Sequence, residues 1–89
     1  MVRRNFTIVN EKGLHARAAA HFAACAEGFE ARCTVRRDGM DASGESIMGL
    51  LMLAAACGTI IEVEAEGPDA EDLLDALAKL IANRFGERM

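Results

Sequence analysis

Two segments of the chain alternate between apolar and polar residues, and this pattern restricts the fold more than any other feature. Residues 31–36 read ARCTVR, so Cys33 and Val35 share one side of an extended chain while two arginines lie on the other. Residues 59–66 read TIIEVEAE, in which three apolar residues alternate with three glutamates. A period of two is typical of strands with one buried and one solvated face. Because opposite charges on paired strands attract each other, we expect these two strands to be neighbours.

Two further strands are predicted from shorter patterns. The segment NFTIV alternates and contains β-branched residues, which indicates a strand over residues 2–9. The pair Asp38-Gly39 is typical of a two-residue hairpin turn. We therefore expect the strand that ends before this turn to continue into a short strand at residues 40–42.

Three helices are predicted between and after the strands. An alanine-rich helix over residues 16–27 should end at Gly28, which would be the left-handed residue that follows many helices. A short apolar helix should begin after Ser46 and end at Gly58. The last helix should begin after Asp69, because an aspartate is a favourable N-cap.

The element order strand-helix-strand-strand-helix-strand-helix predicts an α+β fold. Strands with one charged face, combined with helices that each carry an apolar stripe, form a two-layer open-faced β-sandwich. Helices would then cover one face of the sheet and water the other. The 89 residues suffice for a single domain over residues 1–89.

Composition excludes several classes of function. The net charge is −4 and the chain has no Trp or Tyr, which disfavours nucleic-acid binding. No apolar run is long enough to cross a membrane or to act as a signal peptide, so we expect a cytoplasmic protein that does not bind membranes. No two cysteines form a CxxC pair, so we expect neither a disulfide framework nor a metal site, and no cofactor. The three cysteines are Cys25, Cys33 and Cys57.

The segment GLHARAA places a histidine at the predicted start of the first helix. His15 is expected to be the N-cap, so the backbone N–H groups of Ala16, Arg17 and Ala18 would have no partner within the helix. These donors and the helix dipole favour an anion, and a guanidinium can bind phosphate oxygens. A neutral imidazole is also a nucleophile near pH 7. The residues alone allow either a surface histidine or a phosphoryl-accepting site here.

The same segment resembles the active-site signature of the HPr family, the phosphocarrier proteins of the phosphoenolpyruvate-dependent sugar phosphotransferase system. A second segment, SIMGLLMLAA, is similar to the regulatory serine of this family and the helix that follows it. The resemblance covers essentially the whole chain. It implies a four-stranded antiparallel sheet in the order 1-4-2-3, with the strands numbered along the chain and three helices covering the sheet.

The resemblance also implies roles for the residues of the first motif. His15 would be phosphorylated through its Nδ1 nitrogen, and Arg17 would hold the phosphate. The donor would be enzyme I of the phosphotransferase system, and the acceptor an enzyme IIA-type protein. The family usually has proline where this chain has Ala18, and HARAAA looks more like variants of the nitrogen-related regulatory branch. Sugar uptake and nitrogen-linked regulation are both kept as hypotheses.

Ser46 has two interpretations. From the pattern alone it is the N-cap of the short apolar helix. The resemblance implies that HPr kinase/phosphorylase could phosphorylate it with ATP, and the added negative charge would slow transfer at His15. In this helix Leu50, Leu53 and Ala54 are expected to fill the core. The resemblance favours a partner-docking patch beside His15, made by Ala20, His21, Ile47, Met48 and Leu51.

Three functional hypotheses follow. The first is a monomeric phosphoryl carrier that takes part in transfer without being a stand-alone enzyme. The second is a regulatory binding protein whose partner contacts depend on phosphorylation of Ser46. The third is an unrelated ligand-binding α/β sandwich. Labelling by phosphoenolpyruvate with enzyme I, or by ATP with the kinase, would separate the first two.

Overall fold

A computed structural model describes residues 1–88 and shows four strands in one antiparallel sheet. The strand order is β1-β4-β2-β3, so the first and fourth strands are neighbours and the hairpin of the second and third lies at the other edge. This confirms the predicted fold class and sheet order. The strands are β1 (Val2–Thr7), β2 (Arg32–Arg37), β3 (Met40–Ser43) and β4 (Ile60–Glu66).

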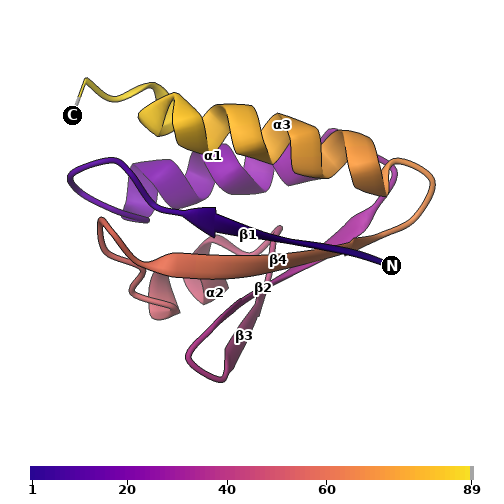
Figure 1. The fold of residues 1–89 in the computed structure, drawn as a ribbon, viewed down its shortest axis with the longest axis horizontal. Coiled ribbons are helices and arrows are strands. Elements are labelled where there is room, and N and C mark those ends of the chain that lie inside the picture. The colour runs from indigo at the N-terminus through magenta and orange to yellow at the C-terminus, as the bar shows by residue number, and fades with distance from the viewer. Residues whose placement is uncertain (89) are drawn as a thin grey trace.

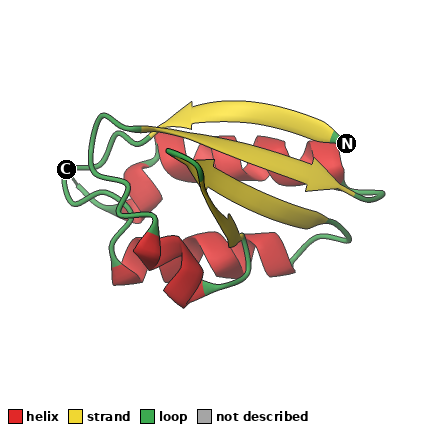
Figure 2. Ribbon diagram, turned by 90° about the horizontal axis from the view of Figure 1, so that it is seen from below, coloured by secondary structure: helices red, strands yellow, loops and turns green. Residues whose placement is uncertain are grey.

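The helices lie together on one face of this sheet, as predicted (Figures 1 and 2). Helices α1 and α3 run side by side above the sheet in Figure 1, and the shorter α2 lies near the hairpin of β2 and β3. The C-terminal tail lies at the same end of the molecule as the loop between β1 and α1 (Figure 1). The helices are α1 (Ala16–Glu27), α2 (Ile47–Met52), α3 (Ala70–Ala82) and a short 3₁₀ turn, η1 (Arg84–Gly86).

The core lies between the sheet and the helices. Val35 and Val63 are directly opposite each other on β2 and β4, and both are fully buried. They pack in one apolar cluster with helix residues such as Phe22, Leu50 and Leu77. The alternation seen in the sequence therefore places the apolar face of each strand against the helices.

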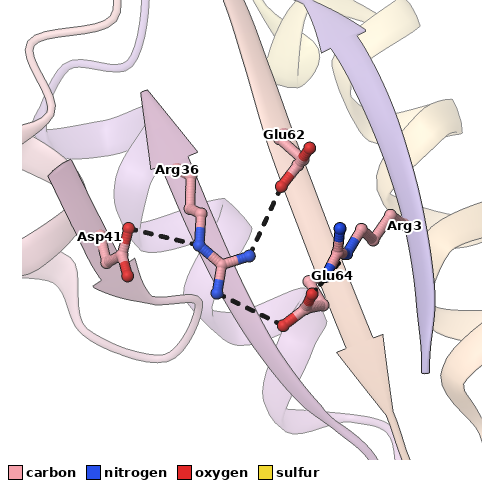
Figure 3. A network of polar contacts seen from close by, with 5 residues as sticks. All are labelled: Arg3, Arg36, Asp41, Glu62 and Glu64. Carbon is pink, nitrogen blue, oxygen red and sulfur yellow. Dashed lines mark hydrogen bonds and ion pairs between the residues drawn. The ribbon is translucent and has the colours of Figure 1, made fainter. Parts of the chain in front are cut away.

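The opposite face of the sheet carries a network of charged side chains (Figure 3). Arg36 of β2 contacts Asp41, Glu62 and Glu64 at 3.3, 3.4 and 3.4 Å. Arg3 of β1 contacts Glu64 from the other side at 2.6 Å. These contacts confirm that β2 and β4 pair with opposite charges facing each other. Partly exposed ion pairs contribute about 0.2–1 kcal/mol each, so the network favours this register more than it stabilises the fold.

Strand β1 ends at Thr7, two residues before the predicted end. Ile8 continues the hydrogen bonding, since its N–H donates to Thr59 O at 2.9 Å and its carbonyl accepts from Gly58 N at 2.7 Å. The chain then turns outward at Val9, which is 40% exposed. This turn begins the loop that leads to α1.

Helix α2 is shorter than its apolar sequence predicts and ends at Met52. Ala54 has a φ of 50°, which an α-helix does not accommodate. A guanidinium nitrogen of Arg37 donates to the carbonyl oxygen of Leu53 at 2.8 Å and satisfies this helix end. The prediction that Ala54 fills the core is wrong, because it is exposed and Ala55 is buried instead.

Two predicted helix ends also differ from the structure. Gly28 follows α1 but has a right-handed φ of −77°, so the predicted left-handed cap is wrong. Asp69 precedes α3 as predicted, but its side chain makes no capping bond to that helix. Its carboxylate accepts instead from Glu30 N at 2.7 Å and joins the loop before β2 to the start of α3.

Candidate functional site

His15 lies at the N-terminus of α1, where the sequence predicts it. Its backbone is extended, with φ −80° and ψ −178°, and its carbonyl oxygen accepts from Ala19 N at 2.8 Å. The imidazole makes no capping hydrogen bond and is 29% exposed. The side chain is therefore free for other contacts at the positive end of the helix dipole.

The loop before His15 is held by short-range and long-range hydrogen bonds. Leu14 N donates to the carbonyl oxygen of Ala55, which follows α2, at 2.9 Å. His15 N donates to Gly13 O at 2.9 Å, and Gly13 N donates to Asn10 O at 3.1 Å. Leu14 is buried, with 4% of its surface exposed, and anchors the loop in the core. These bonds fix the position at which α1 begins.

The C-terminal segment turns back toward this loop after α3. Arg84, Phe85 and Gly86 have successive left-handed φ values of 55°, 54° and 81°. A non-glycine residue in this region costs roughly 1–2 kcal/mol. Phe85 is 2% exposed, and burial of a phenylalanine contributes about 1.5–3 kcal/mol, which offsets part of that cost. The turn brings the next residue, Glu87, to His15.

Glu87 links the imidazole of His15 to the side chain of Asn10, and this hydrogen-bonded group of three residues is called the imidazole bracket. The Nε2 atom of His15 contacts the Oε2 atom of Glu87. The other carboxylate oxygen, Oε1, accepts from Asn10 Nδ2 at 2.9 Å, and Asn10 Nδ2 also donates to Gly13 O at 2.8 Å. Asn10 is fully buried, and its Oδ1 atom has no hydrogen-bond partner among the described residues.

The charge of Glu87 is set by these neighbours. The hydrogen bond from Asn10, the hydrogen bond from His15 and the positive charge of Lys12 hold the pKa of Glu87 below its usual value. The group is therefore a carboxylate at neutral pH and can only accept hydrogen bonds. In the contact with Nε2 of His15, the Oε2 atom of Glu87 can therefore only be the acceptor.

A cleft of about 350 Å³ opens beside the imidazole bracket. Arg17 reaches into its wall from the first turn of α1 and makes no ion pair with any residue of the described chain. Three cationic and two anionic side chains therefore surround the cleft, together with one glycine. The lining residues are Glu11, Lys12, Arg17, Gly86, Glu87 and Arg88.

The other predicted site residues lie on α1 and α2. Ala16 is exposed, whereas Ala18, at the third helical position, is fully buried. Ser46 is the N-cap of α2 as predicted, and its Oγ atom accepts from Gly49 N at 3.0 Å. Ala20 and His21 are exposed on α1.

The outer surface of α2 is apolar and exposed. Met48 is 69% exposed, Ile47 is 43% exposed and Leu51 is half-buried. Met52 is 73% exposed as well, although the sequence reasoning did not include it in the patch. Helices α1 and α2, which carry the predicted patch residues, are in contact with each other.

Sequence reasoning missed Asn10 and Glu87. Glu87 is 72 positions from its contact His15, and it follows the last helix in a segment with no periodic pattern. Asn10 lies in the loop before His15, where a polar residue is ordinary. Only the buried turn at Phe85 brings the two residues together.

The described residues form no metal site. Within residues 1–88, no group of three His, Cys, Asp or Glu side chains is placed to hold a metal ion. Among the same residues, no helix combines the length and apolar character that a bilayer crossing requires.

Comparisons with known proteins show which sequences and structures this chain is similar to. Residues 2–83 match the family model described as PTS HPr component phosphorylation site. The chain is 46% identical to the phosphocarrier protein HPr of Cupriavidus necator, over 98% of each chain. It is 41% identical to the phosphocarrier protein NPr of Shewanella violacea, over 97% of this chain and 94% of that one. The crystal structure of HPr-C-His from Thermoanaerobacter tengcongensis superposes with a TM-score of 0.94, at 37% identity and full coverage of both chains.

Proposed function

Because the chain belongs to the HPr family of phosphocarrier proteins, we propose that His15 accepts a phosphoryl group on Nδ1 from phosphorylated enzyme I and passes it to an enzyme IIA-type protein. The transfer would take place in the cytoplasm. This role needs a nucleophile that is accessible, oriented and surrounded by groups that tolerate a phosphate.

The observation that carries this proposal is the position of His15 as the N-cap of α1 with its imidazole unused for capping. The unpaired N–H groups of the first helical turn can receive phosphate oxygens. Arg17, which lines the adjacent cleft, adds a guanidinium without an ion pair in the described chain. The same donors would stabilise the charge that spreads over the transferring group.

The decisive experiment labels the protein with phosphoenolpyruvate and enzyme I. We expect His15→Ala to lose all acid-labile label, and His21→Ala, on the same helix, to reach the same final amount of label as wild type, because a residue of the docking surface affects the rate of labelling and not its site. Label retained in His15→Ala would show that the site is elsewhere. The labelled wild-type protein should then be offered to a sugar-specific and to a nitrogen-related enzyme IIA protein, and the faster transfer identifies the branch.

The exposed surface of α2 is proposed to dock both partners. Ile47, Met48 and Leu51 form an apolar patch, to which Ala20 and His21 of α1 add exposed surface. Unbranched methionine adapts to differently shaped partners, which suits a carrier that must bind a donor and an acceptor in turn.

A regulatory role for Ser46 is the second proposal, with HPr kinase/phosphorylase as the modifying enzyme. Its hydroxyl stands at the start of α2, next to the exposed Ile47 and Met48. A phosphate there would be tolerated by the helix N-terminus and would add about two negative charges beside the patch. Docking of an acidic partner would then be weakened without unfolding of the helix.

This second proposal is tested with the kinase and ATP. We expect acid-stable label in the wild-type protein and none in Ser46→Ala, with His15→Ala labelled as well as wild type. Equal labelling of wild type and Ser46→Ala would exclude Ser46 as the modified residue.

A further inference from the structure

We propose that Glu87 is a positioning residue for phosphoryl transfer: it holds His15 as the tautomer protonated on Nε2, and this leaves the Nδ1 lone pair as the nucleophile. The inference rests on the proposed transfer at His15 and adds the group that selects the reacting nitrogen. Glu87 lies outside residues 2–83, which match the family model.

The bracket brings two carboxylate oxygens against two nitrogen atoms. The two carboxylate oxygens of Glu87 face two different groups, Nε2 of His15 and Nδ2 of Asn10. Asn10 Nδ2 is an amide nitrogen and can only donate. A carboxylate satisfies both neighbours only when Nε2 of His15 also donates. In a neutral imidazole, the proton on Nε2 leaves Nδ1 with its lone pair.

The bracket is rigid. Asn10 is fully buried and also donates to Gly13 O at 2.8 Å, so its side chain is held in place within the loop that precedes His15. On the other side, the buried Phe85 anchors the turn two residues before Glu87. The carboxylate of Glu87 is 14% exposed, so water competes little with His15 and Asn10 for its oxygen atoms.

The tautomer protonated on Nε2 accounts for the bond changes of the proposed transfer. The Nδ1 lone pair of His15 forms the new bond to phosphorus, and the bond between phosphorus and the donor breaks with its electron pair returning to the donor. The proton on Nε2 stays in place, so the phosphorylated ring carries a positive charge. The carboxylate of Glu87 faces that charge through the existing hydrogen bond and stabilises it. Transfer onward reverses these bond changes.

The isosteric variant Glu87→Gln tests this assignment. A glutamine at this position has one oxygen and one NH₂ group in place of two oxygens. If its oxygen accepts from Asn10, its NH₂ must donate to Nε2 of His15, which moves the imidazole proton to Nδ1. The variant should therefore remove the lone pair from the reacting nitrogen.

The measurement is the ¹⁵N chemical shift of both ring nitrogens in the unphosphorylated full chain, taken at about pH 9, where imidazoles are neutral. We expect His15 of the wild type to show the shifts of a ring protonated on Nε2, and Glu87→Gln to shift toward the ring protonated on Nδ1. The exposed His21 supplies an internal reference in the same spectrum. We also expect Glu87→Gln to accept phosphate from enzyme I about 10-fold more slowly.

Glu11→Gln is the matched control. Glu11 lines the same cleft, so the change in charge is equal, but it makes no hydrogen bond to His15 among the described residues. This variant should leave the His15 shifts unchanged. Unchanged His15 shifts in Glu87→Gln would overturn the inference, as would equal effects of both variants on the transfer rate. The spectra need no enzyme I, so they stand even if His15→Ala shows that phosphate is accepted elsewhere.

Discussion

The carbonyl oxygen of Ala55 lies 2.5 Å from the point where a Cβ atom on Gly13 would stand. The same oxygen accepts from Leu14 N at 2.9 Å, so the loop before His15 is pressed against the segment that follows α2. Gly13 also has a φ of +67°, in the left-handed region. The glycine of the GLH motif is therefore required by two separate constraints.

Gly13→Ala is expected to lower the free energy of unfolding by more than about 2 kcal/mol, because the left-handed backbone alone costs roughly 1–2 kcal/mol and the clash adds to it. The matched control is Gly39→Ala, whose φ is +80° but whose Cβ would meet no atom within 4 Å. Urea unfolding of both variants measures the difference. Equal losses would mean that contact with Ala55 is unimportant.

Ser46→Ala is expected to destabilise the fold by about 0.5–2 kcal/mol, because the Oγ atom that accepts from Gly49 N is lost. Ser46→Asp keeps an acceptor at the N-cap and should stay close to wild type in thermal unfolding. An equal loss in both variants would show that the lost stability does not come from the hydrogen-bond acceptor at the N-cap. The aspartate variant also mimics part of the charge of a phosphate, and enzyme I should label its His15 more slowly.

Because of the charged face of the sheet, the free energy of unfolding should fall as the pH is lowered into the acidic range. Hydrogen bonds from Arg36 and Arg3 lower the pKa of Glu64 below its usual 4.5. A carboxyl group whose pKa is lower in the folded state stabilises the protein above its unfolded pKa, and this contribution is lost as the pH falls toward the folded value. We therefore expect wild type to exceed Glu64→Gln in unfolding free energy at pH 6, with the difference shrinking below about pH 4.5.

A suitable control for that experiment is Glu66→Gln on the same strand. Glu66 is exposed and makes no ion pair among residues 1–88. Denaturant titrations at several pH values should show a smaller pH-dependent difference for this variant. A gap between wild type and Glu64→Gln that stays constant with pH would contradict the role assigned to the ion pairs.

Truncation of an exposed side chain of α2 should weaken partner binding, whereas truncation of a buried one should lower stability. Met48→Ala, at a side chain 69% exposed, should change stability by less than about 0.5 kcal/mol and weaken binding to enzyme I. Leu50→Ala, at a fully buried position, should lose about 2–5 kcal/mol. Calorimetric titration with enzyme I and urea unfolding measure the two effects. Unchanged affinity in Met48→Ala would remove this residue from the docking surface.

Patterns in the sequence predict the fold class and two of the three strand pairings, because each level of the pattern agrees with the next, whereas the pairing of β1 with β4 followed from the family resemblance. Alternation in residues 31–36 and 59–66 predicted the pairing of β2 and β4, and the Asp38-Gly39 turn predicted the hairpin that joins β2 to β3. These are local signals with a fixed period. The position of His15 at the start of α1 was predictable for the same reason.

The features that the sequence did not predict depend on contacts between distant segments. Helix α2 ends at Met52, and Arg37 of strand β2 donates a hydrogen bond to the carbonyl oxygen of Leu53 at this helix end. Glu87 reaches His15 through three left-handed residues in succession, of which only one is a glycine. Tertiary contacts stabilise both arrangements against the local preference of the chain, and a local pattern cannot show them.

The turn at Phe85 joins the hydrophobic core to the residue that contacts His15. Among residues 1–88, Phe85 is the last buried apolar residue, and Glu87 lies two positions beyond it. A carboxypeptidase that trimmed the chain back to Gly86 would leave every core side chain in place, yet it would take away the carboxylate at His15. Such a protein would keep its helices and strands and therefore its far-UV spectrum, so a measurement of intact mass is needed to detect the loss of Glu87.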